Sequence, residues 1–192
     1  MKIVVGTRNA HKIGELTEIL SPVLVGIDLI PATGEAPVED GASFYENALI
    51  KARAAFQDSG IPAIADDSGI EVPALGGEPG IHSARYSPSG EDEDNTELLL
   101  SKMLGITDRR AEFVCAAAYV TPQGEYVIER RWEGTLAEGP SGAGGFGYDP
   151  IFIPKGLTIT SAEMAPTDKN ELSHRGQAFR ALAEVMATLP AH

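Results

Sequence analysis

The chain has 192 residues, 43% of them hydrophobic and 22% charged, a globular composition that argues against disorder along its whole length. Its 28 acidic residues outnumber 15 basic ones and give a formal net charge of −13, which disfavours a general nucleic-acid binder. The single cysteine excludes an internal disulfide framework and a cysteine-based zinc site. No apolar run approaches the roughly 20 residues that span a bilayer, and no signal-peptide core is present, so we expect a cytoplasmic protein without a membrane partner.

The first part of the chain alternates strand and helix patterns. A β-branched run over residues 2–6 predicts a strand, and apolar residues at helical spacing over 13–20 predict a helix that Pro22 closes. Residues 23–30 are expected to form a second, buried strand. The polar segment 31–41 is too long for a simple turn and predicts a loop of the kind that often carries function.

A capping-box pattern marks the start of the second helix. The Ser43 hydroxyl can accept from one free backbone amide while the Glu46 side chain reaches back to another. Asn47 and Lys51, four residues apart, share a face that differs from the apolar stripe of this helix. Both side chains can therefore point together at something polar.

A third strand over 61–65 is expected to deliver Asp66 and Asp67 at its carboxyl end. Open α/β sheets place ligands at such strand ends, which favours a metal-binding or base role for this pair. Consecutive strand residues point to opposite sides, so both carboxylates serve one site only if the chain turns there. The alternative is a plain turn or capping aspartate before Gly69.

The second half contains longer strands. An ordered surface excursion is expected over 73–90, and the acidic residues 91–94 favour a helix start. Residues 112–121 and 125–133 predict two antiparallel strands, the first in the sheet interior. The last helix has apolar residues at helical spacing, namely Phe179, Leu182, Met186 and Leu189.

A glycine-rich segment, residues 142–147, matches the dinucleotide-binding pattern G-x-G-x-x-G. Pro150 and a β-type run follow it, so no helix N-terminus is available for a pyrophosphate, and the dinucleotide interpretation fails. A flexible turn remains one interpretation. The other is a close-approach loop that presents Phe146 and Asp149 to a purine base.

Two clusters of cations stand at predicted helix starts. Residues 7–12 combine free amides with Lys12 and could cradle a phosphate, although a solvated turn is the alternative. A cation there opposes the helix dipole, so Lys12 needs a partner. The cluster from Lys169 to Arg175 either contacts an anionic or electron-rich ligand or pairs on the surface with Glu171 or Glu184.

Six blocks in order along the chain closely resemble the inosine triphosphate pyrophosphatase family, whose bacterial members act on dITP and XTP. The blocks are Thr7–Lys12, Ser43–Ala52, Ala65–Gly69, Pro79–Tyr86, Gly144–Pro150 and Ser173–Gly176. The resemblance implies one pyrophosphatase domain over 1–192, with a two-lobed α/β fold, a long mixed sheet flanked by helices and a central substrate cleft. It also implies a homodimer and Mg²⁺-dependent hydrolysis of ITP, dITP and XTP to the monophosphate and pyrophosphate.

The resemblance assigns roles by position. Asp67 is implied as metal ligand and base, Glu39 as the second metal ligand, and Lys51 as a catalytic residue that contacts phosphate. Asp40 adds a carboxylate that could compete with Glu39 for the metal. Further phosphate contacts are implied for Thr7, Arg8, Asn9, Ala10, His11, Lys12 and Ser68. Base recognition is implied for Phe146, Gly147, Tyr148, Asp149, Lys169, His174 and Arg175.

Two other functions remain open at the level of sequence. The septum-associated nucleotide pyrophosphatases have a similar fold and act on modified pyrimidine nucleotides. The glycine-rich and Ser173–Gly176 blocks argue against that interpretation. A nucleotide sensor that binds without hydrolysis is disfavoured because it would not need Lys12, Lys51 and a water-activating Asp67.

Overall fold

The computed structural model describes residues 2–7 and 10–189. Its strands are β1 (Lys2–Val5), β2 (Asp28–Pro31), β3 (Ala63–Glu71), β4 (Arg110–Thr121), β5 (Gly124–Leu136) and β6 (Phe152–Pro154). Its α-helices are α1 (Ala10–Leu20), α2 (Phe44–Ser59), α3 (Asp92–Lys102), α4 (Pro166–Leu172) and α5 (His174–Thr188). Short 3₁₀ helices are η1 (Pro73–Leu75), η2 (Gly80–Arg85), η3 (Asp149–Ile151) and η4 (Ser161–Glu163). No helix within the described residues has the length and apolar content that a membrane crossing requires.

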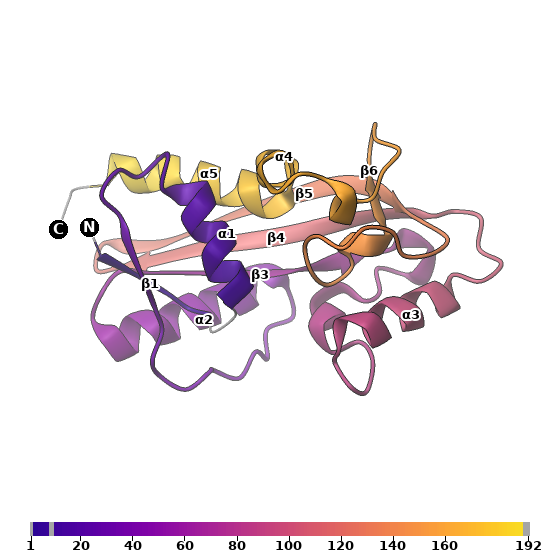
Figure 1. The fold of residues 1–192 in the computed structure, drawn as a ribbon. Helices are drawn as coiled ribbons and strands as arrows, with labels where there is room; N and C mark the ends of the chain where they lie inside the picture. Colours follow the sequence, from indigo (N-terminus) through magenta and orange to yellow (C-terminus); the bar gives the residue numbers. More distant parts are fainter. Residues whose placement is uncertain (1, 8–9, 190–192) are drawn as a thin grey trace. The chain divides into compact units, whose positions relative to one another are not determined.

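The described strands form one six-stranded sheet in the order β2-β1-β3-β4-β5-β6 (Figure 1). β1 pairs in parallel with both β2 and β3, whereas β5 and β6 are antiparallel. The two-residue connection between β4 and β5 makes them a hairpin, as the sequence predicted. The fold is therefore α/β with a mixed sheet and flanking helices, which confirms the predicted class.

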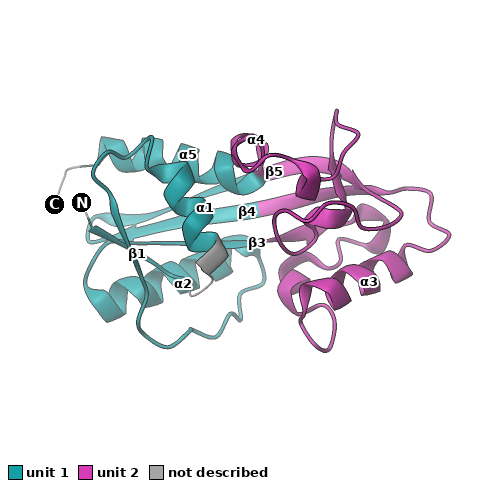
Figure 2. Cartoon of the chain, viewed as in Figure 1, with its two compact units in different colours: residues 1–67, 115–130, 174–192 teal, residues 68–114, 131–173 magenta. Residues whose placement is uncertain are grey.

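Contacts divide the chain into two compact units (Figure 2). Unit 1 comprises residues 1–67, 115–130 and 174–192, and unit 2 comprises residues 68–114 and 131–173. β3, β4 and β5 each contribute residues to both units. The two-lobed arrangement with a central cleft, and a single domain over the whole chain, stay predictions.

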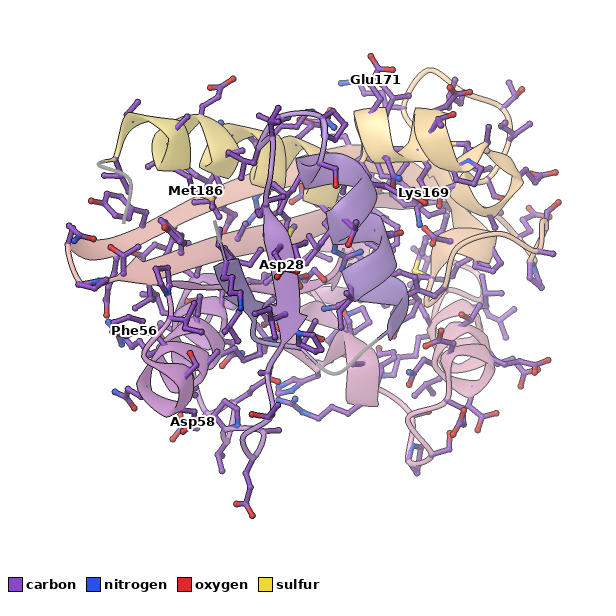
Figure 3. The ribbon with its side chains drawn as sticks, turned by 60° about the vertical axis from the view of Figure 1, so that its left-hand side comes forward. Asp28, Phe56, Asp58, Lys169, Glu171 and Met186 are labelled. Atoms are coloured by element: carbon purple, nitrogen blue, oxygen red, sulfur yellow. The ribbon has the colours of Figure 1, made fainter. Side chains whose placement is uncertain are left out.

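Unit 1 buries apolar side chains on both faces of its strands. Ile3 and Val5 of β1 belong to a core with residues of α1 and α5, whereas Val4 between them packs with Ala55 of α2. This alternation follows from the two-residue period of a strand. Figure 3 shows the same division, with Met186 on α5 and Phe56 on α2 at opposite sides of the strands.

Unit 2 has a core rich in aromatic residues. Phe113 and Phe152 pack edge to face with ring centroids 4.6 Å apart, and Trp132 lies 5.3 Å from Phe152. Leu99 of α3 and Tyr148 complete this core from outside the strands. Trp132 is therefore a core residue.

The prediction of a buried strand over 23–30 was wrong in its bounds and its burial. β2 begins only at Asp28, and Val25 is 95% exposed. The chain turns at Gly26, whose φ of +76° suits a residue without a Cβ. β2 is also one of the two edge strands of the sheet, and among the described strands it neighbours only β1.

The predicted start of α2 is confirmed, with one difference. The N–H of Glu46 donates to the Ser43 hydroxyl at 3.2 Å, as the capping box requires. The Glu46 carboxylate, however, accepts from the N–H of Ala42 at 2.7 Å, one residue before the expected partner. The helix ends at Gly60 in the left-handed conformation.

Candidate functional site

Asp66 and Asp67 lie in the middle of β3. The sequence placed them at the end of a strand over 61–65, but β3 continues to Glu71. Because the strand does not turn, its two carboxylates point to opposite sides and have separate partners. Asp67 pairs with Lys51 of α2, and Asp66 pairs with Lys12 of α1. Asp66 and Asp67 therefore belong to two separate clusters of charged side chains.

The first cluster joins Asp67, Lys51 and Glu39. The Lys51 ammonium nitrogen Nζ donates to Asp67 Oδ1 at 2.8 Å and to Glu39 Oε2 at 2.9 Å. Asp40, the possible competitor of Glu39, is exposed. Asp67 Oδ2 is buried and has no hydrogen-bond partner among the described residues. A carboxylate oxygen in that position can accept from water or bind a cation.

Burial and charge shift the pKa values in this cluster. Burial raises the pKa of the Asp67 carboxyl, although attraction to Lys51 partly opposes the change. For Lys51, burial acts to lower the pKa, but attraction to Asp67, Asp66 and Glu39 together outweighs it and raises the pKa. Lys51 therefore stays cationic beside a carboxylate with an increased affinity for protons.

The second cluster is a buried ion-pair network around Asp66. Asp66 Oδ2 accepts from Lys12 Nζ at 3.1 Å and from Arg175 Nη2 at 3.2 Å, while Arg175 Nη1 donates to Glu15 at 2.7 Å. Burial opposes ionisation of Asp66, but the attraction of Lys12, Arg175 and Lys51 holds its pKa well below the usual range. Asp66 thus supplies the partner that Lys12 needed at its helix start.

Only some of the other predicted phosphate-binding positions lie within the described residues. Arg8 and Asn9 lie outside the described residues, and the same holds for the side chains of Ala10 and His11, whose backbones open α1. Thr7 follows β1, and its N–H donates to the carbonyl of Val5 at 2.8 Å. Ser68 follows Asp67 on β3 and belongs to unit 2.

A third cluster, in unit 2, brings together Phe146, Asp149 and Lys169. Asp149 Oδ2 accepts from Lys169 Nζ at 2.6 Å and from the N–H of Phe146 at 2.9 Å, and its Oδ1 accepts from the Ser161 hydroxyl at 2.8 Å. Lys169 Nζ also lies 5.3 Å from the centre of the Phe146 ring. A Cβ at Gly145 would come 2.1 Å from Asp149 Oδ2, so the turn requires a glycine there.

The cations predicted for base recognition belong to different elements. Lys169 lies in the short helix α4 of unit 2, whereas His174 and Arg175 open α5 in unit 1. Lys169 is buried and points differently from its exposed neighbour Glu171 (Figure 3). Its ammonium group forms an ion pair with the buried Asp149.

Sequence reasoning missed several partners of these residues. Glu15, which binds Arg175, stands on a helix whose sequence gives no hint of a buried cation 160 positions away. Ser161, whose hydroxyl donates to Asp149 Oδ1, is 12 positions away in the sequence and comes close only when the chain folds. Strand periodicity, by contrast, did indicate that the side chains of Asp66 and Asp67 would point to opposite sides of the strand. That rule holds here because β3 does not turn at the pair.

These observations define an α/β protein with carboxylates and lysines gathered in unit 1 and an aromatic turn with a buried lysine in unit 2. The chain belongs to the Ham1 family, whose model matches residues 3–185. A Streptomyces coelicolor protein named dITP/XTP pyrophosphatase is 48% identical over 197 residues, which cover 98% of each chain.

Solved structures show the same relationship. A HAM1 protein from Coxiella burnetii has a TM-score of 0.89 and 37% identity, with 98% of this chain and 100% of that chain covered. A structure entitled nucleoside-triphosphatase / dITP/XTP pyrophosphatase from Mycobacterium abscessus has a TM-score of 0.77 and 47% identity, with coverage of 97% and 99%. The resemblance inferred from six sequence blocks is therefore confirmed at the level of the family.

Proposed function

We propose that this chain hydrolyses non-standard purine nucleoside triphosphates, namely ITP, dITP and XTP, to the monophosphate and pyrophosphate. The observation that carries the proposal is the cluster in which Lys51 bridges Asp67 and Glu39, while Asp67 Oδ2 is buried and has no hydrogen-bond partner among residues 2–7 and 10–189. Relatives that match nearly the whole chain carry the name dITP/XTP pyrophosphatase. The cluster supplies the chemistry that such a hydrolysis needs.

We also propose that Glu39 and Asp67 hold Mg²⁺. Carboxylate oxygens are the ligands that Mg²⁺ prefers, and a buried carboxylate oxygen without a partner is costly unless it binds something. Within the described residues no three histidine, cysteine or carboxylate side chains form a metal-binding group. Two protein carboxylates suit Mg²⁺, which usually keeps several waters and binds substrate phosphates. When bound, the ion neutralises charge on the triphosphate.

The residues of unit 1 then have distinct tasks. Lys51 and Lys12 offset the roughly four negative charges of a triphosphate in a chain whose net charge is −13. Asp67 orients a water molecule and takes its proton as the water oxygen bonds to the α-phosphorus. The bond from the α-phosphorus to the bridging oxygen breaks, and pyrophosphate leaves with that electron pair.

Base selectivity follows from hydrogen bonding at the C6 position. Hypoxanthine and xanthine have a carbonyl there, whereas adenine has an amino group. A buried donor aimed at C6 would meet another donor in adenine, and a mismatch of this kind can discriminate by roughly 10⁴-fold. Lys169, His174 and Arg175 are the candidate donors. Lys169 lies 5.3 Å from the Phe146 ring and pairs with Asp149, whereas Arg175 pairs with Asp66 and Glu15.

The test is a substrate panel with pyrophosphate as the measured product. We expect release from ITP, dITP and XTP in the presence of Mg²⁺, little release from ATP, and none from any substrate after chelation with EDTA. Release only from modified pyrimidine triphosphates would support the septum-associated alternative. Binding of ITP without release would support a sensor, and equal rates on ATP and ITP would remove the donor explanation.

Homodimer formation and a cytoplasmic location remain proposals for this chain. Light scattering on the purified protein tests the first, and fractionation of the source cells tests the second. Neither a nucleic-acid nor a membrane partner is proposed, since the surface of so acidic a chain would repel phosphate backbones and anionic lipids.

A further inference from the structure

The turn from Phe146 to Asp149 is fixed residue by residue. The N–H of Phe146 donates to Asp149 Oδ2, and the Tyr148 hydroxyl donates to the carbonyl of Ser83 at 2.8 Å. Asp149 itself is buried against Lys169 and Ser161. The partner in each of these hydrogen bonds lies either within the turn or among the buried residues of unit 2. Gly147, the remaining residue, is held differently.

Gly147 is held by helix α3. Its N–H donates to Asp92 Oδ2 at 2.6 Å, a short bond to an ionised acceptor. The Thr96 hydroxyl, one turn further along the same helix face, lies 3.5 Å from the Gly147 carbonyl oxygen. Gly147 has a φ of +62°, so it adopts a conformation that glycine reaches without strain and also leaves readily. The bond to Asp92 opposes that freedom.

Close packing does not hold this side of the turn. A cavity of about 410 Å³ lies between α3 and the glycine-rich segment, with Asp92, Thr96 and Leu100 on one side and Phe146 and Gly147 on the other. A hollow of this size means that few apolar contacts oppose movement of the turn towards α3. Polar links across the hollow therefore contribute much of what positions Gly147.

We propose that Asp92 is a positioning residue for base recognition: by holding the N–H of Gly147, it keeps Phe146 and Asp149 in the arrangement that receives the purine. The inference rests on the proposed function, since it supposes that the turn binds a base. Asp92 is exposed and belongs to the first turn of α3 in unit 2, whereas the carboxylates Glu39 and Asp67 belong to unit 1. Its loss should weaken substrate binding and leave the chemical step intact.

The experiment compares Asp92→Ala, Asp92→Asn and Glu93→Ala. Glu93 is a matched control, because it also lies in the first turn of α3, lines the same cavity and is exposed. Amide hydrogen exchange over residues 142–150 is measured without substrate. Steady-state kcat and KM are measured with ITP and Mg²⁺. The asparagine variant keeps an acceptor oxygen for the Gly147 amide and should recover part of the loss.

We expect Asp92→Ala to speed exchange at the Gly147 amide and to raise KM for ITP, each by about tenfold, the effect of losing one bond to a charged acceptor. kcat should stay within about twofold of wild type, because only binding is weakened. Glu93→Ala should change neither quantity. Unchanged exchange in Asp92→Ala, unchanged KM, or an equal effect of Glu93→Ala would each overturn the inference. If the wild type releases no pyrophosphate from ITP, the proposed function fails, while exchange still decides whether Asp92 holds the turn.

Discussion

Asp66 and Asp67 are chemically identical neighbours, and their surroundings give them different roles. Asp66 has a side chain that is 1% exposed and is bound by two cations, so its charge is offset within unit 1. Asp67 shares one cation with Glu39, and burial raises the pKa of its carboxyl. The first carboxylate therefore stabilises the fold, and the second is available for chemistry.

Substitution of Asp67 by asparagine tests its part in the reaction. We expect kcat for ITP to fall by about 10²–10⁴-fold, because an amide cannot take a proton from water. Thermal denaturation should show that the variant stays folded. Asp40→Asn is the matched control, since Asp40 is exposed beside Glu39, and it should keep nearly the wild-type rate. Wild-type turnover in the Asp67 variant would end its assignment as the base.

Substitution of Asp66 by alanine tests its structural role. It leaves Arg175, whose side chain is 4% exposed, without one of its carboxylate partners, and breaking such a buried pair costs about 3–5 kcal/mol. Urea denaturation measures this loss in the free energy of unfolding. Asp108→Ala is the control, because Asp108 also pairs with an arginine but in an exposed position, where little stability is at stake. Similar stabilities of the two variants would contradict the assigned role of Asp66.

The elements show why some local features were predictable. The capped start of α2 depends on residues within one turn of the boundary, and it was found where the sequence placed it. The strand expected over 23–30 failed because its burial depends on neighbours, and β2 lies at the sheet edge. β3 was predicted too short because the polar residues Asp66, Asp67 and Ser68 hid its continuation.

The predicted position of β4 in the interior of the sheet can be tested directly. Nearly all its residues from Ala111 to Thr121 are buried, and burial raises the pKa of the Cys115 thiol. We expect this single cysteine to react with a thiol reagent at pH 8 at least about a hundredfold more slowly in the native protein than in denaturant, since reaction needs local opening. Equal rates would contradict the buried position of β4.

At the scale of the whole molecule, the contacts between site residues were foreseeable in one unit and not in the other. The resemblance grouped Lys51, Glu39 and Asp67, and their side chains lie in contact, while their roles stay predictions. The role of Asp149 in base recognition also stays a prediction, and its oxygens accept from Phe146, Ser161 and Lys169. Those partners are 3 to 20 positions away and meet only after folding, which sequence patterns do not encode.

Lys51, Glu39 and Asp67 lie together in this acidic chain, and in the proposed reaction water attacks the α-phosphorus of a non-standard purine triphosphate. The point of attack is measured by hydrolysis of ITP in ¹⁸O-labelled water, followed by mass spectrometry of both products. We expect the label in the monophosphate and none in the pyrophosphate. Label in the pyrophosphate, or orthophosphate as the product, would contradict the proposed reaction.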